Sequence, residues 1–104
     1  MARTWERVYL VMPYKFEYGI FDTYATTAFK SKEDALTSAK AVWEGFKEDN
    51  DNFETDDWEI IDESDWELDD DTEELDVEYS AINSYTAKEI HVIIKSISLV
   101  GREN

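Results

Sequence analysis

The charge of this chain is concentrated in one segment, and that segment restricts what the rest can fold into. Residues 48–79 hold eighteen Asp and Glu residues and no Lys or Arg, whereas residues 1–47 and 80–104 each carry a formal charge of +1. The net charge of −16 at pH 7 therefore comes from a third of the chain. A surface whose acids served solubility alone would mix in lysines, so we expect the local negative field to have a use of its own.

The length and composition suit one folded domain, spanning residues 1–104. Hydrophobic residues make up 42% of the chain and aromatic residues 14%, enough apolar area to offset the entropy of ordering the backbone. There is no cysteine, which excludes disulfides and thiolate metal sites and suits a reducing cytoplasm. No stretch approaches the roughly 20 apolar residues that span a bilayer, so we expect no membrane contact.

Outside the acidic segment, three patterns predict strands. Residues 5–12 are β-branched and aromatic, and apolar on both faces in their second half, which predicts a well-buried strand ending near Pro13. Residues 20–29 predict a second strand, paired to the first after a turn at Gly19. Residues 89–100 are rich in Ile and Val, which predicts a long strand near the middle of the sheet.

One long helix is predicted between these strands, over about residues 32–47. Ser31 is a suitable N-cap, and acidic residues in the first turn favour the positive end of the helix dipole. Apolar residues then recur at helical spacing, with Trp43 and Phe46 as core anchors. We therefore expect an α+β fold in which this helix packs on one face of an antiparallel sheet, in the rough order β-β-α-β-β-β.

The acidic segment contains regularly placed apolar residues, so we expect it to fold as well. Residues 74–79 alternate fully between apolar and acidic residues, which predicts a half-buried strand with an acidic outer face. Trp58 and Trp66 occupy equivalent places in two similar pieces eight residues apart. The two Trp-containing pieces and the piece formed by residues 75–79 are expected to pair as a meander.

A row of carboxylates follows from the same pattern. In an extended chain, acids of one parity lie about 6.6 Å apart on one side. Like charges in such a row repel, so we expect raised pKa values and a domain that gains stability as the pH falls from 7 towards roughly 5. The row comprises Asp65, Glu67, Asp69, Asp71 and Glu73.

The density of this charge favours a nucleic-acid mimic. Eighteen carboxylates over the roughly 40 Å that a once-folded acidic segment would span give one per about 2.2 Å, against one per about 1.7 Å of duplex DNA. We expect an inhibitor of the anti-restriction or anti-CRISPR type, from a phage or mobile element, that occupies the basic groove of a nucleic-acid-binding protein. Lys32 and Lys40 are expected to lie outside the interface. The expected partner-binding residues are Asp56, Asp57, Glu59, Asp62, Glu63, Asp65, Trp66, Glu67, Asp69, Asp70, Asp71, Glu73, Glu74, Asp76 and Glu78.

Other hypotheses for the acidic segment stay open. An immunity protein, an antitoxin or a chaperone would bind a basic protein without imitating DNA, through a compact patch around Trp58 or Trp66. Clustered oxygens at Asp69-Asp70-Asp71 would suit calcium, although no EF-hand loop is present.

Catalysis and direct nucleic-acid binding are not expected. Nothing singles out a catalytic pair among the twenty-six acids, and no cofactor motif is present. His91 is the only histidine and has no second ligand or nucleophile nearby in sequence, so we expect it to be structural. A net charge of −16 repels phosphates, which excludes nucleic acid as a direct partner.

Overall fold

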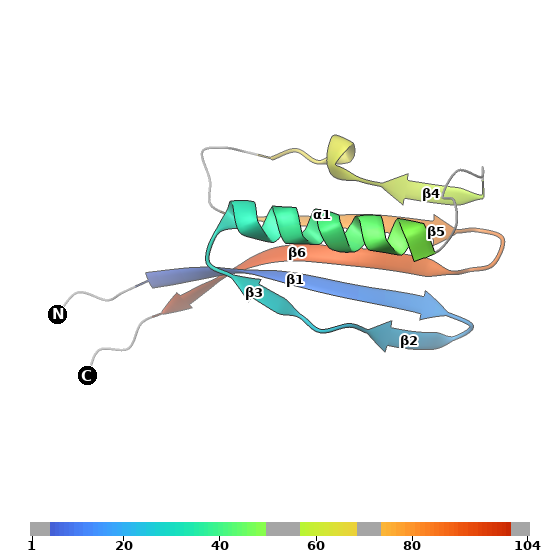
Figure 1. The fold of residues 1–104 in the computed structure, drawn as a ribbon, viewed down its shortest axis with the longest axis horizontal. Helices are drawn as coiled ribbons and strands as arrows, with labels where there is room; N and C mark the ends of the chain where they lie inside the picture. Colours follow the sequence, from blue (N-terminus) through green and yellow to red (C-terminus); the bar gives the residue numbers. More distant parts are fainter. Residues whose placement is uncertain (1–4, 50–56, 69–73, 101–104) are drawn as a thin grey trace.

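The computed structural model describes residues 5–49, 57–68 and 74–100, which form a six-stranded antiparallel sheet with one long helix on one face (Figure 1). The strands lie in the order β2-β1-β6-β5-β4, and β3 also pairs with β1, on the side where β2 lies. The predicted α+β class and its single long helix are confirmed, with β-β-β-α-β-β-β as the observed order. The elements are β1 (Trp5–Glu17), β2 (Ile20–Thr23), β3 (Thr27–Phe29), α1 (Lys32–Asp49), β4 (Trp58–Ile61), the short 3-10 helix η1 (Glu63–Asp65), β5 (Asp76–Asn83) and β6 (Glu89–Val100).

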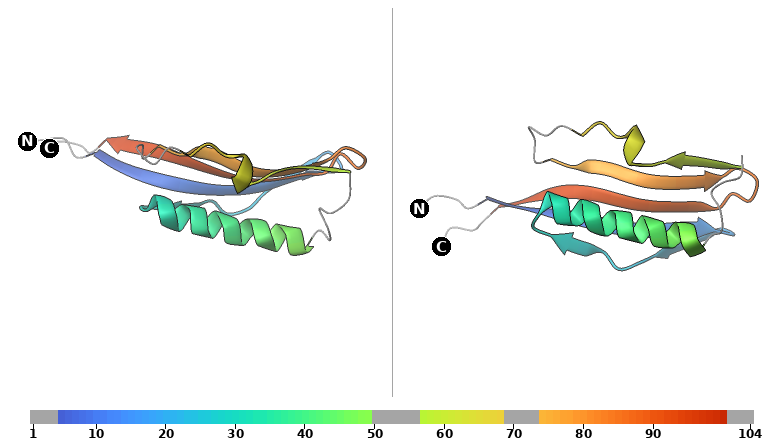
Figure 2. Two further views of the ribbon diagram at one scale, coloured as in Figure 1. Left: turned by 90° about the horizontal axis from the view of Figure 1, so that it is seen from above. Right: turned by 45° about the horizontal axis from the view of Figure 1, so that its top comes forward.

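The described part of the chain is arranged in two layers. Figure 2 (left) shows α1 on one side of the sheet, while the other side of the sheet carries no described element. We call this second side the open face. Successive side chains of a strand point to opposite faces of the sheet. The buried hydrophobic residues of β1, β5 and β6 therefore mark the face that lies against the helix.

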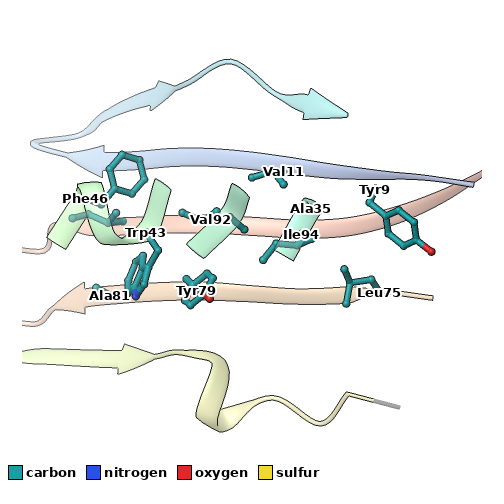
Figure 3. Close-up of a cluster of buried hydrophobic side chains, with 12 residues drawn as sticks. Tyr9, Val11, Ala35, Trp43, Phe46, Leu75, Tyr79, Ala81, Val92 and Ile94 are labelled. Carbon is teal, nitrogen blue, oxygen red and sulfur yellow. The ribbon is translucent and has the colours of Figure 1, made fainter. Parts of the chain in front are cut away.

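The core lies between α1 and the central strands. Helical spacing brings Ala35, Ala39, Trp43 and Phe46 onto one side of α1, and all four side chains are buried. Beneath them lie Tyr9 and Val11 of β1, Tyr79 and Ala81 of β5, and Ile90, Val92 and Ile94 of β6 (Figure 3). The N-terminus of α1 has the predicted cap, because the backbone N–H of Asp34 donates to the Ser31 hydroxyl at 3.3 Å.

Strand β1 continues four residues beyond Pro13, so the prediction that it ends near the proline is wrong. The carbonyl of Pro13 accepts the backbone N–H of Tyr24, which places both backbone groups of the proline on the side of β2 and β3. Ladder pairing on that side stops at Val11 and resumes at Tyr14. The missing N–H of Pro13 therefore falls in a gap where no strand needs it.

The predicted second strand is divided into β2 and β3, both of which pair with β1. A two-residue turn at Tyr18 and Gly19 joins β1 to β2, and its φ angles of 53° and 76° are both positive. Such a turn matches the right-handed twist of the two strands, and glycine adopts it without steric cost. The turn predicted at Gly19 is confirmed.

Strand β6 is the long central strand that the sequence predicts, and it lies between β1 and β5. It begins after a tight loop in which the side-chain oxygen of Asn83 accepts the backbone N–H groups of Tyr85 and Thr86, each at 2.9 Å. No helix in the described ranges has the length and apolarity needed to cross a membrane.

Candidate functional site

Residues 57–68 of the acidic segment lie along one long edge of the sheet, seen at the top of Figure 1. Strand β4 pairs with the last four residues of β5, from Ser80 to Asn83. The chain then turns at η1 and runs alongside the first half of β5. We call the described residues 57–68 and 74–78 the acidic edge.

The Trp58 piece forms a strand, β4, as predicted, but the meander is wrong, because β4 pairs with residues 80–83 of β5 and the Trp66 piece forms no strand. Residues 62–65 form a capped turn instead of a strand. The Asp62 carboxylate accepts the backbone N–H of Ser64 at 2.9 Å and its hydroxyl at 2.6 Å, while the Asp65 carboxylate accepts the N–H of Asp62 at 3.0 Å. These short side chains satisfy local backbone groups that a strand would pair with its neighbour, so the chain turns.

The expected straight row of carboxylates is interrupted at its first member. Asp65 lies in η1, and Glu67 follows in a segment without regular structure, so the two do not sit on one side of an extended strand. The other three members, Asp69, Asp71 and Glu73, lie outside the described residues.

Trp66 fastens the acidic edge to the body of the protein. Its indole N–H donates to the backbone carbonyl of Glu78 at 2.8 Å, and its ring packs edge-on against Tyr79 with centroids 4.7 Å apart. Tyr79 in turn stacks on Trp43 of α1 at 5.2 Å, and Figure 3 shows these two rings together. The acidic edge is thus continuous with the core through three aromatic rings.

Glu63 makes a second attachment, on the helix side of the sheet. Its carboxylate lies 3.4 Å from the ammonium group of Lys40, so Lys40, which is expected to lie outside the partner interface, contacts one of the expected partner-binding residues. The backbone N–H of Glu63, together with Lys40 and the Tyr79 hydroxyl, lowers the pKa of the Glu63 carboxyl. The pKa of the Tyr79 hydroxyl is raised, mainly because the group is buried and secondly because the negative charge of Glu63 lies nearby.

Hydrogen bonds also lower the pKa of the Asp62 carboxyl. The bond from the Ser64 hydroxyl has the largest effect, and the bond from the Ser64 backbone N–H comes second. A hydrogen bond to the ionised form of a carboxyl stabilises that form. Asp62 and Glu63 lie outside the expected row of carboxylates, and local hydrogen bonds lower their pKa values although acidic residues surround them.

Strand β5 has the predicted alternation. Leu75 and Tyr79 are buried beneath the helix, whereas Asp76 and Glu78 point to the open face. Asp76 lies opposite Lys95 of β6 in the sheet register.

His91 of β6 lies beside Glu78 on the open face. Its Nε2 is 3.1 Å from Glu89 and its Nδ1 is 3.5 Å from Glu78, while its ring stacks on Tyr14 with centroids 4.6 Å apart. The Nδ1 contact has ion-pair distance without hydrogen-bond geometry. His91 therefore has a packed position between two carboxylates, which its place in the sequence did not reveal.

Carboxylates lie on both flanks of this edge. Glu63 is on the helix side, since it contacts Lys40, whereas Glu59, Asp76 and Glu78 have the parity of the open face. The ten residues from Glu74 to Asn83 span about 33 Å at about 3.3 Å per residue, so nine carboxylates give one per about 3.7 Å. The nine are Asp57, Glu59, Asp62, Glu63, Asp65, Glu67, Glu74, Asp76 and Glu78.

A hollow of about 490 Å³ lies between the chain on either side of η1 and the first half of β5. Apolar side chains of Trp66, Val77 and Ile93 line it together with the acids Glu67, Asp76 and Glu78. An apolar wall beside carboxylates matches a long cationic side chain, whose stem is apolar and whose tip is charged.

The structure brings most of the expected partner-binding residues together on this edge. Asp57, Glu59, Glu63, Asp65, Glu67, Glu74 and Asp76 are exposed there, whereas Asp62, Trp66 and Glu78 are partly buried. Asp56, Asp69, Asp70, Asp71 and Glu73 lie outside the described residues, and the hypothetical calcium run lies there too. Among described residues, no three acidic or histidine side chains are grouped so that they could hold a metal ion. Comparison of the chain with models of protein families, with curated proteins and with solved structures gave no match.

Proposed function

We propose that this protein is an acidic inhibitor that binds the basic groove of a nucleic-acid-binding protein, such as a nuclease, restriction enzyme or RNA-guided effector, in the place of nucleic acid. The observation that carries the proposal is the acidic edge, with carboxylates on both flanks over about 33 Å. Counted over both flanks, their spacing of about 3.7 Å corresponds to roughly half the charge density of duplex DNA, which carries one charge per about 1.7 Å with both strands counted. The protein acts by binding and not by catalysis, in the cytoplasm where such partners work.

The hollow beside Trp66 supports the same partner chemistry. A groove that holds nucleic acid is lined with Lys and Arg, and one such side chain would place its stem against Trp66 and Val77 and its charge near Glu67. This contact would add an apolar component to a largely electrostatic interface.

The alternative of a basic partner bound without mimicry is less well supported. It requires Trp58 or Trp66 to be an exposed anchor at the centre of a compact patch. Both rings instead pack against the core, and the Trp66 N–H is already bonded to Glu78. The carboxylates of the acidic edge, and not exposed tryptophan rings, are therefore the main groups that can contact a partner.

The proposal is tested by binding a panel of purified restriction enzymes, nonspecific nucleases and RNA-guided effectors to two double variants with the same change in net charge. Glu59→Lys with Glu67→Lys reverses two carboxylates of the acidic edge, while Asp22→Lys with Glu33→Lys reverses two exposed carboxylates elsewhere. For any panel member that binds the wild type, we expect the edge variant to lose at least about tenfold in affinity and the control variant to stay close to the wild type.

Equal losses from both variants would mean that the overall charge attracts the partner and that the acidic edge is not the contact surface. Binding of the wild type to none of these protein classes would remove the proposal itself. Circular dichroism of both variants verifies that they are folded.

A further inference from the structure

The open face of the sheet is largely apolar on β1, where a solvated face would be polar, although Glu89, His91 and Lys95 of β6 also stand on it. Because Tyr9 and Val11 face the helix, the alternate residues of β1 face the other way. Strand β6 adds Ile93 and Ile97, which pair with Met12 and Val8, and β2 adds Phe21, which packs on Tyr14 at 5.1 Å. An antiparallel sheet with one side in water shows polar residues on that side. On β1 the open-face residues are Val8, Leu10, Met12, Tyr14 and Phe16.

These side chains remain accessible in the described structure. Ile97 is 39% exposed and Phe21 is 57% exposed, and both stand on the open face. Several apolar side chains gathered on an accessible face of a folded domain mark a surface that another molecule covers.

We propose that the open face is covered by the open face of a second copy, which makes the protein a homodimer. The surface has the size that such a dimer needs. Four strand positions about 4.8 Å apart and the nine residues from Val8 to Phe16 define a face of about 19 by 30 Å, or about 1,200 Å² for the pair. Stable interfaces begin at about this area.

The charges of the open face select one way of pairing the two copies. Asp76 and Glu78 stand on the β5 side of this face, whereas its β2 and β3 side carries the uncharged Phe21, Thr23 and Ala28. A two-fold axis parallel to the strands places β5 of one copy over β2 and β3 of the other, so the acids meet no acids. A two-fold axis across the strands would place β5 over β5, where like charges repel.

This dimer is a four-layer sandwich in which the two sheets are inside and the two helices outside. Residues 57–68 of the two acidic edges lie on opposite sides and stay open to other proteins. The inference does not rest on the proposed function, because the centre of the dimer contact is the apolar part of β1 and β6, and only Asp76 and Glu78 of the acidic edge lie at its rim.

Sedimentation equilibrium of the full chain tests the dimer through a matched pair of variants. Ile97 and Ile60 are 39% and 36% exposed, but Ile97 is on the open face and Ile60 has the parity of the helix side. At about 100 µM protein in moderate salt we expect a mass of twice 12.2 kDa for the wild type and for Ile60→Lys, and a monomer for Ile97→Lys. Phe21→Ser, a second open-face change, should also give a monomer.

A monomeric wild type under these conditions would overturn the dimer and would leave the open face to a different protein. A fully dimeric Ile97→Lys together with a dimeric Phe21→Ser would show that the copies associate through another surface. Either result leaves the binding test of the acidic edge unaffected.

A spin label at one site tests the proposed symmetry. The chain has no cysteine, and Tyr85 is 86% exposed in the loop between β5 and β6, so Tyr85→Cys gives a single labelling position. With the axis parallel to the strands, the two labels lie at the same end of the dimer, about 20 Å apart. A separation of about 40 Å or more, the length of β6, would place them at opposite ends and overturn this arrangement.

Discussion

Trp66 and Glu78 are joined by a hydrogen bond of 2.8 Å from the indole N–H to a backbone carbonyl, although twelve residues separate them in the chain. The carbonyl belongs to the outer side of β5, at a point that β4 does not reach. The side chain of Trp66 thus takes the place of a missing strand neighbour. This bond holds the carboxylates that precede and follow Trp66 in fixed positions beside β5.

Replacement of Trp66 should loosen the acidic edge without changing its charge. Trp66→Phe keeps the ring contact with Tyr79 but loses the bond to Glu78, for an expected cost of about 1 kcal/mol in the free energy of unfolding. Trp66→Ala also loses the ring contact with Tyr79, so we expect the free energy of unfolding to fall by about 2–3 kcal/mol. This is less than for a fully buried tryptophan, because the Trp66 side chain is only partly buried. Urea denaturation followed by circular dichroism measures both, with Tyr85→Ala in the exposed loop as the control. Equal stability of all three variants would show that Trp66 does not anchor the edge.

The lowered pKa of Asp62 predicts a loss of stability in acid. A carboxyl whose folded-state pKa lies below its ordinary value of 3.8 contributes stability above that pH, and the contribution disappears as the pH falls below it. Asp62→Asn keeps an acceptor for the cap but does not titrate. Urea denaturation should therefore show the wild type more stable than Asp62→Asn at pH 7, with a difference that shrinks at about pH 3. A difference that stays constant over this range would mean that ionised Asp62 gains nothing from its bonds to Ser64.

The raised pKa of Tyr79 predicts the opposite behaviour in alkali. The unfolded chain ionises this group near pH 10.0 while the folded chain keeps it protonated, so its contribution to stability is complete below that pH and is lost as the pH rises above it. Spectrophotometric titration of the folded protein should show a tyrosine that ionises later than the ordinary value. In Tyr79→Phe that late step should be missing. A late step that persists in this variant would assign the behaviour to another tyrosine, with Tyr14, whose pKa is also raised, as the first to examine.

The elements with strong local periodicity were predictable from sequence. The helical spacing of apolar residues around Trp43 and Phe46 predicts α1, and the alternation from Glu74 to Tyr79 predicts which residues of β5 are buried and which are exposed. The Ile and Val content of residues 89–100 indicated the central strand. In these elements the local pattern and the tertiary environment favour the same structure.

The remaining features depend on contacts between distant residues or on side chains that compete with the backbone. Pro13 is tolerated within β1 because the neighbouring strand is interrupted there, which no local pattern shows. The turn at η1 had a visible signal, since Asp62 and Asp65 have the spacing of a capping box, but the likeness of the two Trp pieces suggested a strand. The ion pair of Lys40 with Glu63 required the helix and the edge to be placed together.

The most direct test of the proposed function is whether its partner can hold this protein and nucleic acid at the same time. The measurement is fluorescence anisotropy of a labelled duplex bound to a panel protein that binds the wild type, titrated with the wild type, the Glu59→Lys/Glu67→Lys variant and the Asp22→Lys/Glu33→Lys control. We predict that the wild type and the control release the duplex completely, that excess unlabelled duplex reverses the release, and that the edge variant releases little. A ternary complex in which the partner retains the duplex at undiminished affinity while bound to this protein would contradict nucleic-acid mimicry and would favour a basic partner bound at another surface.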